Sequence, residues 1–409
     1  MSELSYLEKL LDGVKVEWLP LGEITKYEQP TKYLVKAKDY HDTYTIPVLT
    51  AGKTFILGYT NETHGIYQAS KAPVIIFDDF TTANKWVDFD FKAKSSAMKM
   101  VTSCDDNKTL LKYVYYWLNT LPSEFAEGDH KRQWISNYSQ KKIPIPCPDN
   151  PEKSLAIQSE IVRILDKFTA LTAELTAELT MRKKQYNYYR DQLLSFKEGE
   201  VEWKSLGEIA TKIYSGGTPD TKRIDYWENG TIPWMSSGEV NLKNIERTEK
   251  YITEAGLNNS SAKLVPKNSV VIALAGQGKT RGKVARIRIA LTTNQSLAAL
   301  TFDEKKFSSD YVFHFLETQY ESLRQISSGN SGRGGLNLQM ISAYKIPIPC
   351  PDNPEKSLAI QSEIVRILDK FDTLTNSITE GLPREIELRQ KQYEYYRDLL
   401  FSFPKKVSA

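Results

Sequence analysis

The segment that most resembles a chemical site is ALAGQGKT, from Ala273 to Thr280. A glycine-rich turn ending in Lys-Thr after a strand is typical of a P-loop, whose backbone amides and lysine hold the phosphates of a nucleotide. A P-loop must open a helix, because the helix N-terminus helps to bind the phosphates. The residues that follow, RGKVARIRIAL, alternate like a strand and carry Gly282 early. We therefore expect a connection between two strands here, and nucleotide binding is the alternative.

The cysteines and histidines are dispersed along the chain, at Cys104, Cys147 and Cys350 and at His41, His64, His130 and His314. Zinc sites and disulfide frameworks use closely spaced ligands such as CxxC pairs, and this chain has none. We expect ordinary thiols, and no metal ion or cofactor held by this chain.

Length and charge bound the remaining possibilities. The 409 residues suffice for two or three domains, and 40% of them are hydrophobic, which excludes disorder of the whole chain. The sequence shows no signal-peptide pattern, and no apolar run approaches the roughly 20 residues that span a bilayer. We expect a cytoplasmic protein that does not enter a membrane. Its net charge is only +3, so binding to nucleic acid would depend on local basic patches or on a partner.

The most informative pattern is an internal repeat. The 27 residues KIPIPCPDNPEKSLAIQSEIVRILDKF at 142–168 recur unchanged at 345–371. Each copy is followed by a second match, RKKQYNYYRDQLLSF at 182–196 and RQKQYEYYRDLLFSF at 389–403. The N-terminal YLEKLLDGVKVEW, from Tyr6, resembles YRDQLLSFKEGEVEW, from Tyr189. The repeat is therefore circularly organised, and the first residues can complete what the last residues leave open.

Two variable blocks, roughly 25–140 and 210–343, lie between the repeated segments and show little similarity to one another. Each contains strand-like runs bounded by Gly, Pro and Asn, at Thr45–Val48, Ala72–Asp79, Asn268–Gly276 and Lys283–Leu291. Each also has a helical candidate near its end, Leu110–Leu118 and Ser309–Leu323. We expect two compact α+β globules on a constant frame.

The constant segments have the apolar period of a coiled coil. Apolar residues step 4, 3, 4, 3, 4 from Ile157 to Leu175, and the stripe resumes after one extra four-residue step in the tandem TAEL tetrapeptides of Thr172–Leu179. Gly381 and Pro383 should kink or break the second copy. The predicted packing residues are Ile157, Ile161, Ile164, Phe168, Leu171, Leu175, Leu179, Tyr186, Tyr189, Leu193, Ile360, Ile364, Ile367, Phe371, Tyr393 and Tyr396. Independent surface helices on separate domains are the alternative.

These features predict an α+β protein with two globules separated by two long constant helices, which pair as an antiparallel coiled coil with pseudo-two-fold, circular organisation. The expected divisions are an N-terminal helical segment (1–15), a first globule (16–148), a central helix (149–198), a second globule (199–351) and a C-terminal helix (352–409).

This arrangement resembles the specificity subunit of type I restriction-modification systems over the whole chain. The resemblance rests on two blocks that each open with a W-x-x-L-G-E-I segment, at Trp18–Ile24 and Trp203–Ile209, and close with KIPIP running into a helix. The TAEL tetrapeptides are similar to those of the IC subgroup. Other family-like stretches are SGGTPD at Ser215–Asp220, TTNQS at Thr292–Ser296 and SGRGGLN at Ser331–Asn337.

The resemblance implies a non-catalytic subunit in which each block is a target recognition domain that reads one half of a bipartite, asymmetric site in double-stranded DNA. It also implies that the helices set the spacing and dock two methyltransferase subunits, which bring S-adenosylmethionine. Motor-nuclease subunits, which use ATP and Mg²⁺, would join for cleavage.

Base reading requires polar side chains on loops that reach the groove edges, and phosphate contacts require Lys, Arg and backbone amides. In the first block the candidates are Thr50, Lys53, Thr81, Thr82, Asn84, Lys85, His130, Lys131, Arg132 and Gln133. In the second block they are Ser215, Thr218, Ser236, Ser237, Lys279, Arg281, Lys283, Asn294, Gln295, Asn330 and Arg333. For any one of these residues, a solvated loop or a polar cap of the fold is the alternative.

The residues also bear on two other functions. An adenine methyltransferase needs an Asn/Asp-Pro-Pro-aromatic motif, and the chain has no Pro-Pro pair. A coiled-coil scaffold or adaptor would explain the helices, but it would leave two dissimilar, loop-rich globules without a task.

Overall fold

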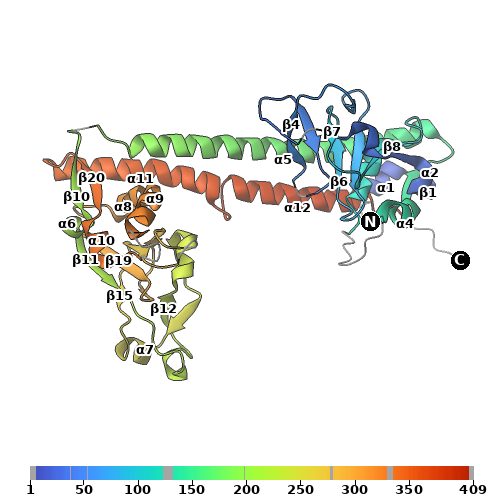
Figure 1. The fold of residues 1–409 in the computed structure, drawn as a ribbon. Helices are drawn as coiled ribbons and strands as arrows, with labels where there is room; N and C mark the ends of the chain where they lie inside the picture. Colours follow the sequence, from blue (N-terminus) through green and yellow to red (C-terminus); the bar gives the residue numbers. More distant parts are fainter. Residues whose placement is uncertain are drawn as a thin grey trace. The chain divides into compact units, whose positions relative to one another are not determined.

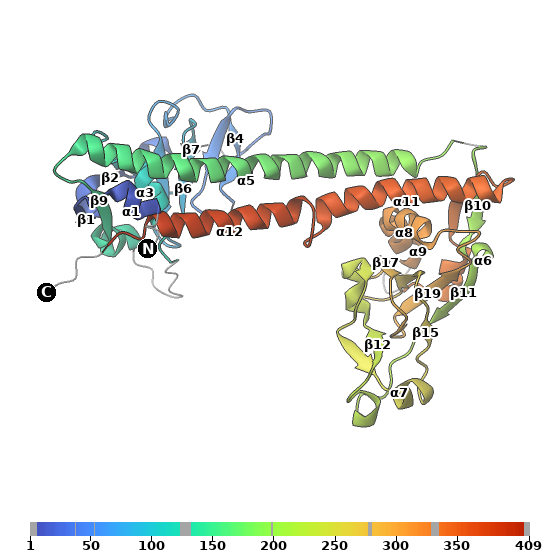
Figure 2. The same cartoon turned by 180° about the vertical axis from the view of Figure 1, so that it is seen from behind.

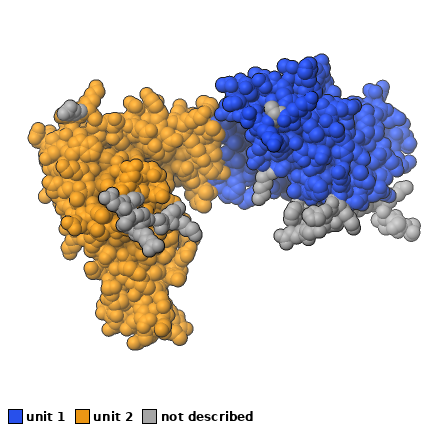
Figure 3. All heavy atoms as spheres, in the orientation of Figure 1, with its two compact units in different colours: residues 1–177, 384–409 blue, residues 178–383 orange. Residues whose placement is uncertain are grey.

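The computed structural model describes residues 6–36, 38–52, 54–122, 132–197, 199–276, 280–328 and 335–404. The chain divides into two compact units, which Figure 3 shows in different colours: unit 1 is Met1–Ala177 with Arg384–Ala409, and unit 2 is Glu178–Pro383. The 43-residue helix α5 (Pro151–Leu193) contributes its first part to unit 1 and its last part to unit 2.

The variable block of unit 1 is a layered α+β structure. The elements before α5 are α1 (Tyr6–Leu11), β1 (Val16–Pro20), α2 (Leu21–Ile24), β2 (Thr25–Glu28), η1 (Pro30–Tyr33), β3 (Ile46–Leu49), β4 (Ile56–Thr60), β5 (Val74–Asp78), β6 (Asn84–Val87), β7 (Lys92–Ala93), β8 (Met98–Ser103), α3 (Leu111–Leu118), α4 (Gln133–Ser136), η2 (Tyr138–Gln140) and β9 (Lys142–Pro146). The sheet β2-β8-β5-β6 lies between the helices and the small sheet β4-β3-β7. The sheet has a core on each face, because successive side chains of central strand β5 point to opposite faces. Ile75 and Phe77 enter the core shared with α3 and α5, whereas Val74 and Ile76 enter the core on the opposite face.

The variable block of unit 2 repeats this plan with different residues. The elements after α5, up to the second constant helix, are β10 (Val201–Ser205), α6 (Leu206–Ile209), β11 (Ala210–Ser215), η3 (Ile224–Tyr226), β12 (Ile232–Met235), η4 (Ser237–Leu242), β13 (Asn244–Ile245), β14 (Lys250–Ile252), α7 (Glu254–Asn258), β15 (Leu264–Val265), β16 (Ser269–Ala273), β17 (Val284–Ile287), β18 (Leu291–Thr293), β19 (Leu297–Phe302), α8 (Ser309–Thr318), α9 (Tyr320–Ser328), α10 (Leu338–Ala343), β20 (Lys345–Pro349) and α11 (Pro354–Asn376). The main sheet is β11-β19-β16-β17-β13, and the second sheet is β14-β12-β18-β15. Figure 1 shows that β12 lies far from α11 within this unit.

The two blocks share the topology of their central strands, and unit 2 adds the edge strands β13 and β15. β2 pairs with β8 as β11 pairs with β19, and β5 lies between β8 and β6 as β16 lies between β19 and β17. In both second sheets one contact is parallel, β3 with β7 and β12 with β18. The strand predictions are confirmed by β3, β5, β16 and β17. The helical candidate at Ser309–Leu323 is two helices, α8 and α9, because the chain leaves helical geometry at Gln319.

The constant segments frame each block in the same way. β1 pairs with β9 and β10 pairs with β20 in equivalent antiparallel registers, with Trp18 opposite Pro144 and Trp203 opposite Pro347. In unit 1 the first part of α5 packs beside α12 (Leu382–Leu400), as Figures 1 and 2 show. In unit 2 the last part of α5 packs beside α11.

In each unit the two helices run antiparallel, as Figures 1 and 2 show, and matching aromatic pairs join them. Phe168 of α5 stacks on Tyr396 of α12 with ring centroids 5.2 Å apart. The equivalent Phe371 of α11 stacks on Tyr189 of α5 at 5.7 Å. Each unit therefore contains one copy of the 27-residue segment, completed by the tyrosine-rich segment that follows the other copy.

The predicted packing residues differ in burial. The buried ones are Ile157, Ile161, Tyr186 and Ile364; the half-buried ones are Ile164, Phe168, Leu175, Leu179, Leu193, Ile360, Ile367, Phe371 and Tyr393; the exposed ones are Leu171, Tyr189 and Tyr396. Leu165 and Leu368, which lie outside the predicted stripe, have no exposed surface. The buried face is therefore turned toward these leucines, because the variable block also packs on the helix.

The chain ends and the break between α11 and α12 are as the sequence predicts. Leu7 and Leu11 of α1 share a core with Leu400 and Phe401, so the first residues do complete the last helix. α11 ends at Asn376, and α12 begins at Leu382. Gly381 lies between them with φ +84°, and a Cβ there would collide with backbone oxygens of α11. The predicted break is confirmed. Among the described helices, none is long and apolar enough to cross a membrane.

Candidate nucleic-acid interface

In unit 2, three loops with predicted DNA contacts meet where the strands end. The Gly217 amide donates to the Thr293 carbonyl at 2.9 Å, and the Asn294 amide donates to the Met235 carbonyl at 3.0 Å. The Thr218 hydroxyl donates to the Gln295 side-chain oxygen at 2.5 Å. These bonds bring together what we call the strand-end cluster of unit 2, which consists of Ser215, Thr218, Ser236, Asn294 and Gln295.

Close backbone approach builds this cluster. Gly216 packs so tightly on Thr293 that a Cβ would overlap the Thr293 carbonyl. Ser236 caps η4, since both its amide and its hydroxyl donate to Glu239. Ser237 is the first residue of that turn. Part of the polar surface of Ser236 is therefore engaged by the fold, while Gln295 is exposed.

Unit 1 has an equivalent cluster, which the sequence reasoning found only in part. The Lys94 amide donates to the Leu49 carbonyl at 2.9 Å, matching the bond from Asn294 to Met235. This bond places the predicted Thr50 beside the exposed Lys94, Ser95 and Ser96, which were not predicted. These four residues are the strand-end cluster of unit 1. The shared TIP of Thr45–Pro47 and Thr231–Pro233 opens the equivalent strands β3 and β12, so it marks the side of the cluster that holds Thr50 but not the loop at 94–96.

A second group in unit 1, the hairpin cluster, forms at the turn from β5 to β6. The turn carries Thr81 and Thr82, and Asn84 and the exposed Lys85 follow in β6. The Gln133 amide donates to the Asp79 carbonyl at 2.9 Å, which brings Gln133 and the exposed Arg132 to the same turn. Thr82 is buried with φ +61°, so it serves the turn itself.

A buried ion pair holds this hairpin cluster in place. Lys99 and Asp79 are 2.9 Å apart, with 0% and 1% of their side chains exposed. The same carboxylate accepts from the Trp134 amide at 3.1 Å. Burying two charges is costly unless they pair and form hydrogen bonds, so the pair fixes one arrangement of the segment that carries Arg132 and Gln133.

The hairpin cluster of unit 2 consists of Arg281 and Lys283. It lies at the equivalent turn, from β16 to β17. The Leu336 amide donates to the Leu274 carbonyl at 3.1 Å, as Gln133 does to Asp79 in unit 1. Arg281 is 8% exposed, and Lys283 donates to the Asn241 side-chain oxygen at 2.6 Å. A cavity of about 200 Å³ lies beside Lys283. β17 follows this turn, which confirms the predicted strand and contradicts the P-loop alternative, because no helix starts here in the described residues.

Some predicted contacts lie outside the described residues. They are Lys53, His130, Lys131, Lys279, Asn330 and Arg333. Their neighbours Arg132 and Arg281 belong to the hairpin clusters.

The side chains of the clusters suit a ligand that presents both base edges and phosphates. An exposed amide group such as that of Gln295 can donate to and accept from base edges. The Thr50 hydroxyl already donates to the Thr54 carbonyl at 2.5 Å and accepts from the Gly52 amide at 3.3 Å, so it shapes the loop of this cluster. The exposed Lys94 and Lys85 and the guanidinium of Arg132 can contact phosphates. Within the described ranges, no group of three or more His, Cys, Asp or Glu side chains is placed to hold a metal ion.

The chain belongs to the family of proteins with a type I restriction modification DNA specificity domain. The family model matches residues 14–181 and 198–388, so each match contains one variable block and the helix after it.

Curated relatives give the same assignment. The chain is 71% identical over 99% of its length to the type I restriction enzyme EcoR124I/EcoR124II specificity subunit of Escherichia coli, covering 98% of that protein. It is 36% identical to the EcoprrI specificity subunit of the same organism, with 93% of each chain covered.

Solved structures show a similar fold at low sequence identity. The type I S subunit of M. genitalium aligns over 96% of this chain and 98% of its own, with a TM-score of 0.61 and 14% identity. A chain from a structure that describes assembly and conformational transition of the type I R-M system aligns over 94% of this chain and 97% of its own, with a TM-score of 0.53 and 15% identity. The α+β fold with two blocks and a long intervening helix is therefore that of specificity subunits.

Proposed function

We propose that this protein is the non-catalytic DNA reader of a type I restriction-modification complex, and that each variable block recognises one half of a bipartite, asymmetric site. The target recognition domains are residues 16–148 and 199–351. The helical regions 149–198 and 352–409, with the N-terminal segment 1–15, form the spacer. As a reader of DNA it would work in the cytoplasm.

One observation carries the proposal: constant segments that share an unchanged 27-residue stretch carry two blocks with the same central topology and different surface residues. The two strand-end clusters lie at equivalent positions, yet Thr50 and Lys94–Ser96 occupy one, and Ser236 and Asn294–Gln295 occupy the other. Such a design suits two sensors for two base sequences, since base edges are distinguished by the pattern of donors and acceptors presented to them.

The proposal assigns a measuring role to the central helix. Each TAEL unit adds about 6 Å of helical rise, and one base-pair step is about 3.4 Å. One tetrapeptide therefore corresponds to one or two base pairs of gap between half-sites. The IC-like TAEL pair in Thr172–Leu179 would tune this gap without touching the reading surfaces.

The helices also offer two matching surfaces for partners. Tyr188 of α5 and Tyr395 of α12 occupy the same position in the two copies, and they are 61% and 64% exposed. Large aromatic groups exposed at equivalent places suit two identical partners. We assign these surfaces to two methyltransferase subunits, which supply S-adenosylmethionine; motor-nuclease subunits, which use ATP and Mg²⁺, join the same complex.

Selection from randomised double-stranded DNA tests the proposal, using the full chain assembled with its methyltransferase partner. We expect enrichment of two short motifs at one fixed separation. Gln295→Ala should relax only the half read by unit 2. Enrichment of a single continuous motif, or of no motif, would favour the scaffold alternative and overturn the proposal.

A further inference from the structure

Each variable block is attached to its constant segment by matching polar contacts, and the first is made at a helix N-terminus. The side-chain oxygen of Gln158 accepts from the Leu110 amide, the N-cap of α3, at 2.9 Å. The equivalent Gln361 accepts from the Ser308 amide, the N-cap of α8, at 2.9 Å. Both glutamines have no exposed surface, so each block presents an amide to a fixed acceptor on the constant helix.

The second contact joins the same block helices to the KIPIP strands. The Tyr113 hydroxyl donates to the Pro144 carbonyl at 2.7 Å, and the Tyr311 hydroxyl donates to the Pro347 carbonyl at 2.7 Å. Both tyrosines occupy the third position after their N-cap. Burial raises the pKa of both phenols, so they remain donors.

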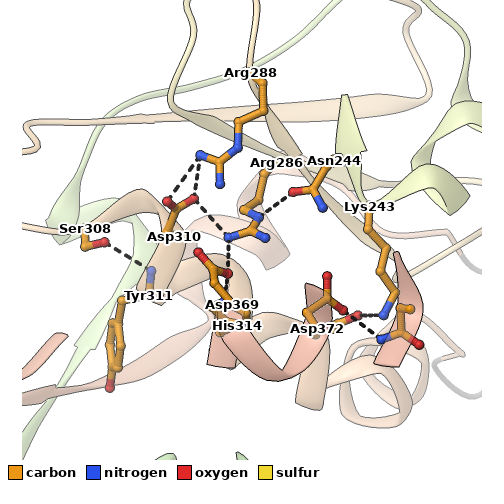
Figure 4. Close-up of polar contacts among 12 residues, drawn as sticks. Lys243, Asn244, Arg286, Arg288, Ser308, Asp310, Tyr311, His314, Asp369 and Asp372 are labelled. Carbon is orange, nitrogen blue, oxygen red and sulfur yellow. Dashed lines mark hydrogen bonds and ion pairs between the residues drawn. The ribbon is translucent and has the colours of Figure 1, made fainter. Parts of the chain in front are cut away.

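At the third contact, an aspartate of the constant helix binds different block residues in the two units. In unit 1, Asp166 accepts from the Tyr116 hydroxyl at 2.5 Å and pairs with Lys112 at 2.9 Å. In unit 2, the equivalent Asp369 accepts from His314 at 2.8 Å and pairs with Arg286 of β17 at 2.7 Å, as Figure 4 shows.

The donors at this third contact are block-specific, and the acceptor is constant. Tyr116 and His314 both lie at the sixth position after the N-cap, on the same helix as the other two contacts. Three separate points of attachment fix the orientation of a rigid body on a surface. We name the constant acceptors of each unit its docking socket: Gln158, Pro144 and Asp166 in unit 1, and Gln361, Pro347 and Asp369 in unit 2.

We propose that the buried glutamines of the two docking sockets, Gln158 and Gln361, are positioning residues that hold each block in one orientation on its helix and so sharpen the measured gap between half-sites. The inference rests on the proposed bipartite reading. The socket acceptors bond to α3 and α8, whereas the residues assigned to DNA lie in the strand-end loops and in the turns from β5 to β6 and from β16 to β17. Loss of a socket contact should therefore broaden the range of accepted gaps between half-sites and leave the base preferences unchanged.

The test uses Gln361→Met, which keeps the approximate side-chain volume and removes the acceptor for the Ser308 amide. The full chain, assembled with its methyltransferase partner, is offered a DNA library with both half-sites fixed and the gap varied. We expect at least a tenfold rise in the enrichment of neighbouring gaps relative to the preferred gap. The matched control is Gln192→Met, an exposed change in the same unit at a position where the other copy has Leu399.

A conservative change distinguishes positioning from general stability. Gln361→Glu keeps an acceptor at the N-terminus of α8, where a negative charge is favourable. The Ser357 hydroxyl, which accepts from Gln361 at 3.1 Å, can turn and donate to the new carboxylate, so this variant should keep the sharp gap. In unit 1, Gln158 also donates to the Lys108 carbonyl at 3.0 Å, so Gln158→Glu should not restore it. Tyr311→Phe removes a single hydroxyl and serves as the second probe if Gln361→Met does not fold.

The outcomes separate the two proposals. A wild-type complex without a bipartite motif would overturn the proposed function. A wild-type complex with a sharp gap, together with folded Gln361→Met or Tyr311→Phe variants of equal sharpness, would overturn the positioning role alone.

Discussion

The carboxylate of Asp369 offers a direct test of the energetics in unit 2. It lies between His314 and Arg286, whose side chains are 1% and 5% exposed. Burial alone would raise the pKa of Asp369, but the hydrogen bond from His314 and the charge of Arg286 outweigh it and lower the pKa to about 2. The substitution Asp369→Asn keeps the shape and removes the charge.

The magnitude follows from that pKa. A shift from 3.8 to about 2 corresponds to about 2 kcal/mol. Because the carboxylate side chain is 35% exposed, solvent screening reduces this to about 1 kcal/mol. A carboxyl group with a depressed folded pKa stabilises the protein above its unfolded pKa, and the contribution disappears as the pH falls from about 4 to 2. We therefore expect Asp369→Asn to lower the free energy of unfolding by about 1 kcal/mol at pH 7 and by about half as much at pH 3.

Denaturant unfolding at both pH values, read by intrinsic tyrosine and tryptophan fluorescence, measures this difference. The matched control is Asp166→Asn at the equivalent position of unit 1. Its partner Lys112 is 32% exposed, so we expect a loss of less than about 1 kcal/mol. Equal losses for the two variants, or a loss for Asp369→Asn that does not shrink at pH 3, would refute the reasoning.

Three further predictions concern the spacer, a buried ion pair and a reading cluster. Deleting Thr176–Leu179 should change the preferred gap by one or two base pairs and leave both half-site sequences intact; a binding selection with an unchanged gap would contradict the measuring role of the central helix. Lys99→Met leaves Asp79 buried without its cation and should lower the unfolding free energy by about 3 kcal/mol in a denaturant titration, whereas a loss below 1 kcal/mol would show that the pair does not order the hairpin cluster. Thr50→Ala removes the hydroxyl that donates to the Thr54 carbonyl and so loosens the loop of the unit 1 cluster; it should weaken discrimination in that half-site by about 1 kcal/mol or less in competition binding, without affecting the other half.

Most of the architecture could be predicted, because it follows from local and repeated sequence patterns. The repeated helical segments, the circular order and the break at Gly381 are visible in the residues themselves. The burial of Leu165 and Leu368 could not be seen in the same way, because a heptad stripe considers only the partner helix. These leucines pack where the constant helix also receives a variable block, so their burial depends on tertiary contacts.

The candidate site was harder to predict, since it forms where distant strands end. The loop at Lys94–Ser96 joins Thr50 only through the parallel pairing of β3 with β7, which no local pattern specifies. The sockets were missed for a related reason: Gln158 appears as an ordinary helical glutamine until the amide of Leu110 approaches it in the fold. Loop residues with polar side chains were easier to identify, because turn composition is a local property.

The central claim is that two unlike blocks on one spacer read a split DNA site. Mapping adenine methylation across the genome of cells that carry this subunit with its partner subunits tests it most directly. The account predicts one asymmetric motif in two parts, separated by a single gap length. Methylation at a continuous motif, or at both half-motifs over many separations, would contradict it.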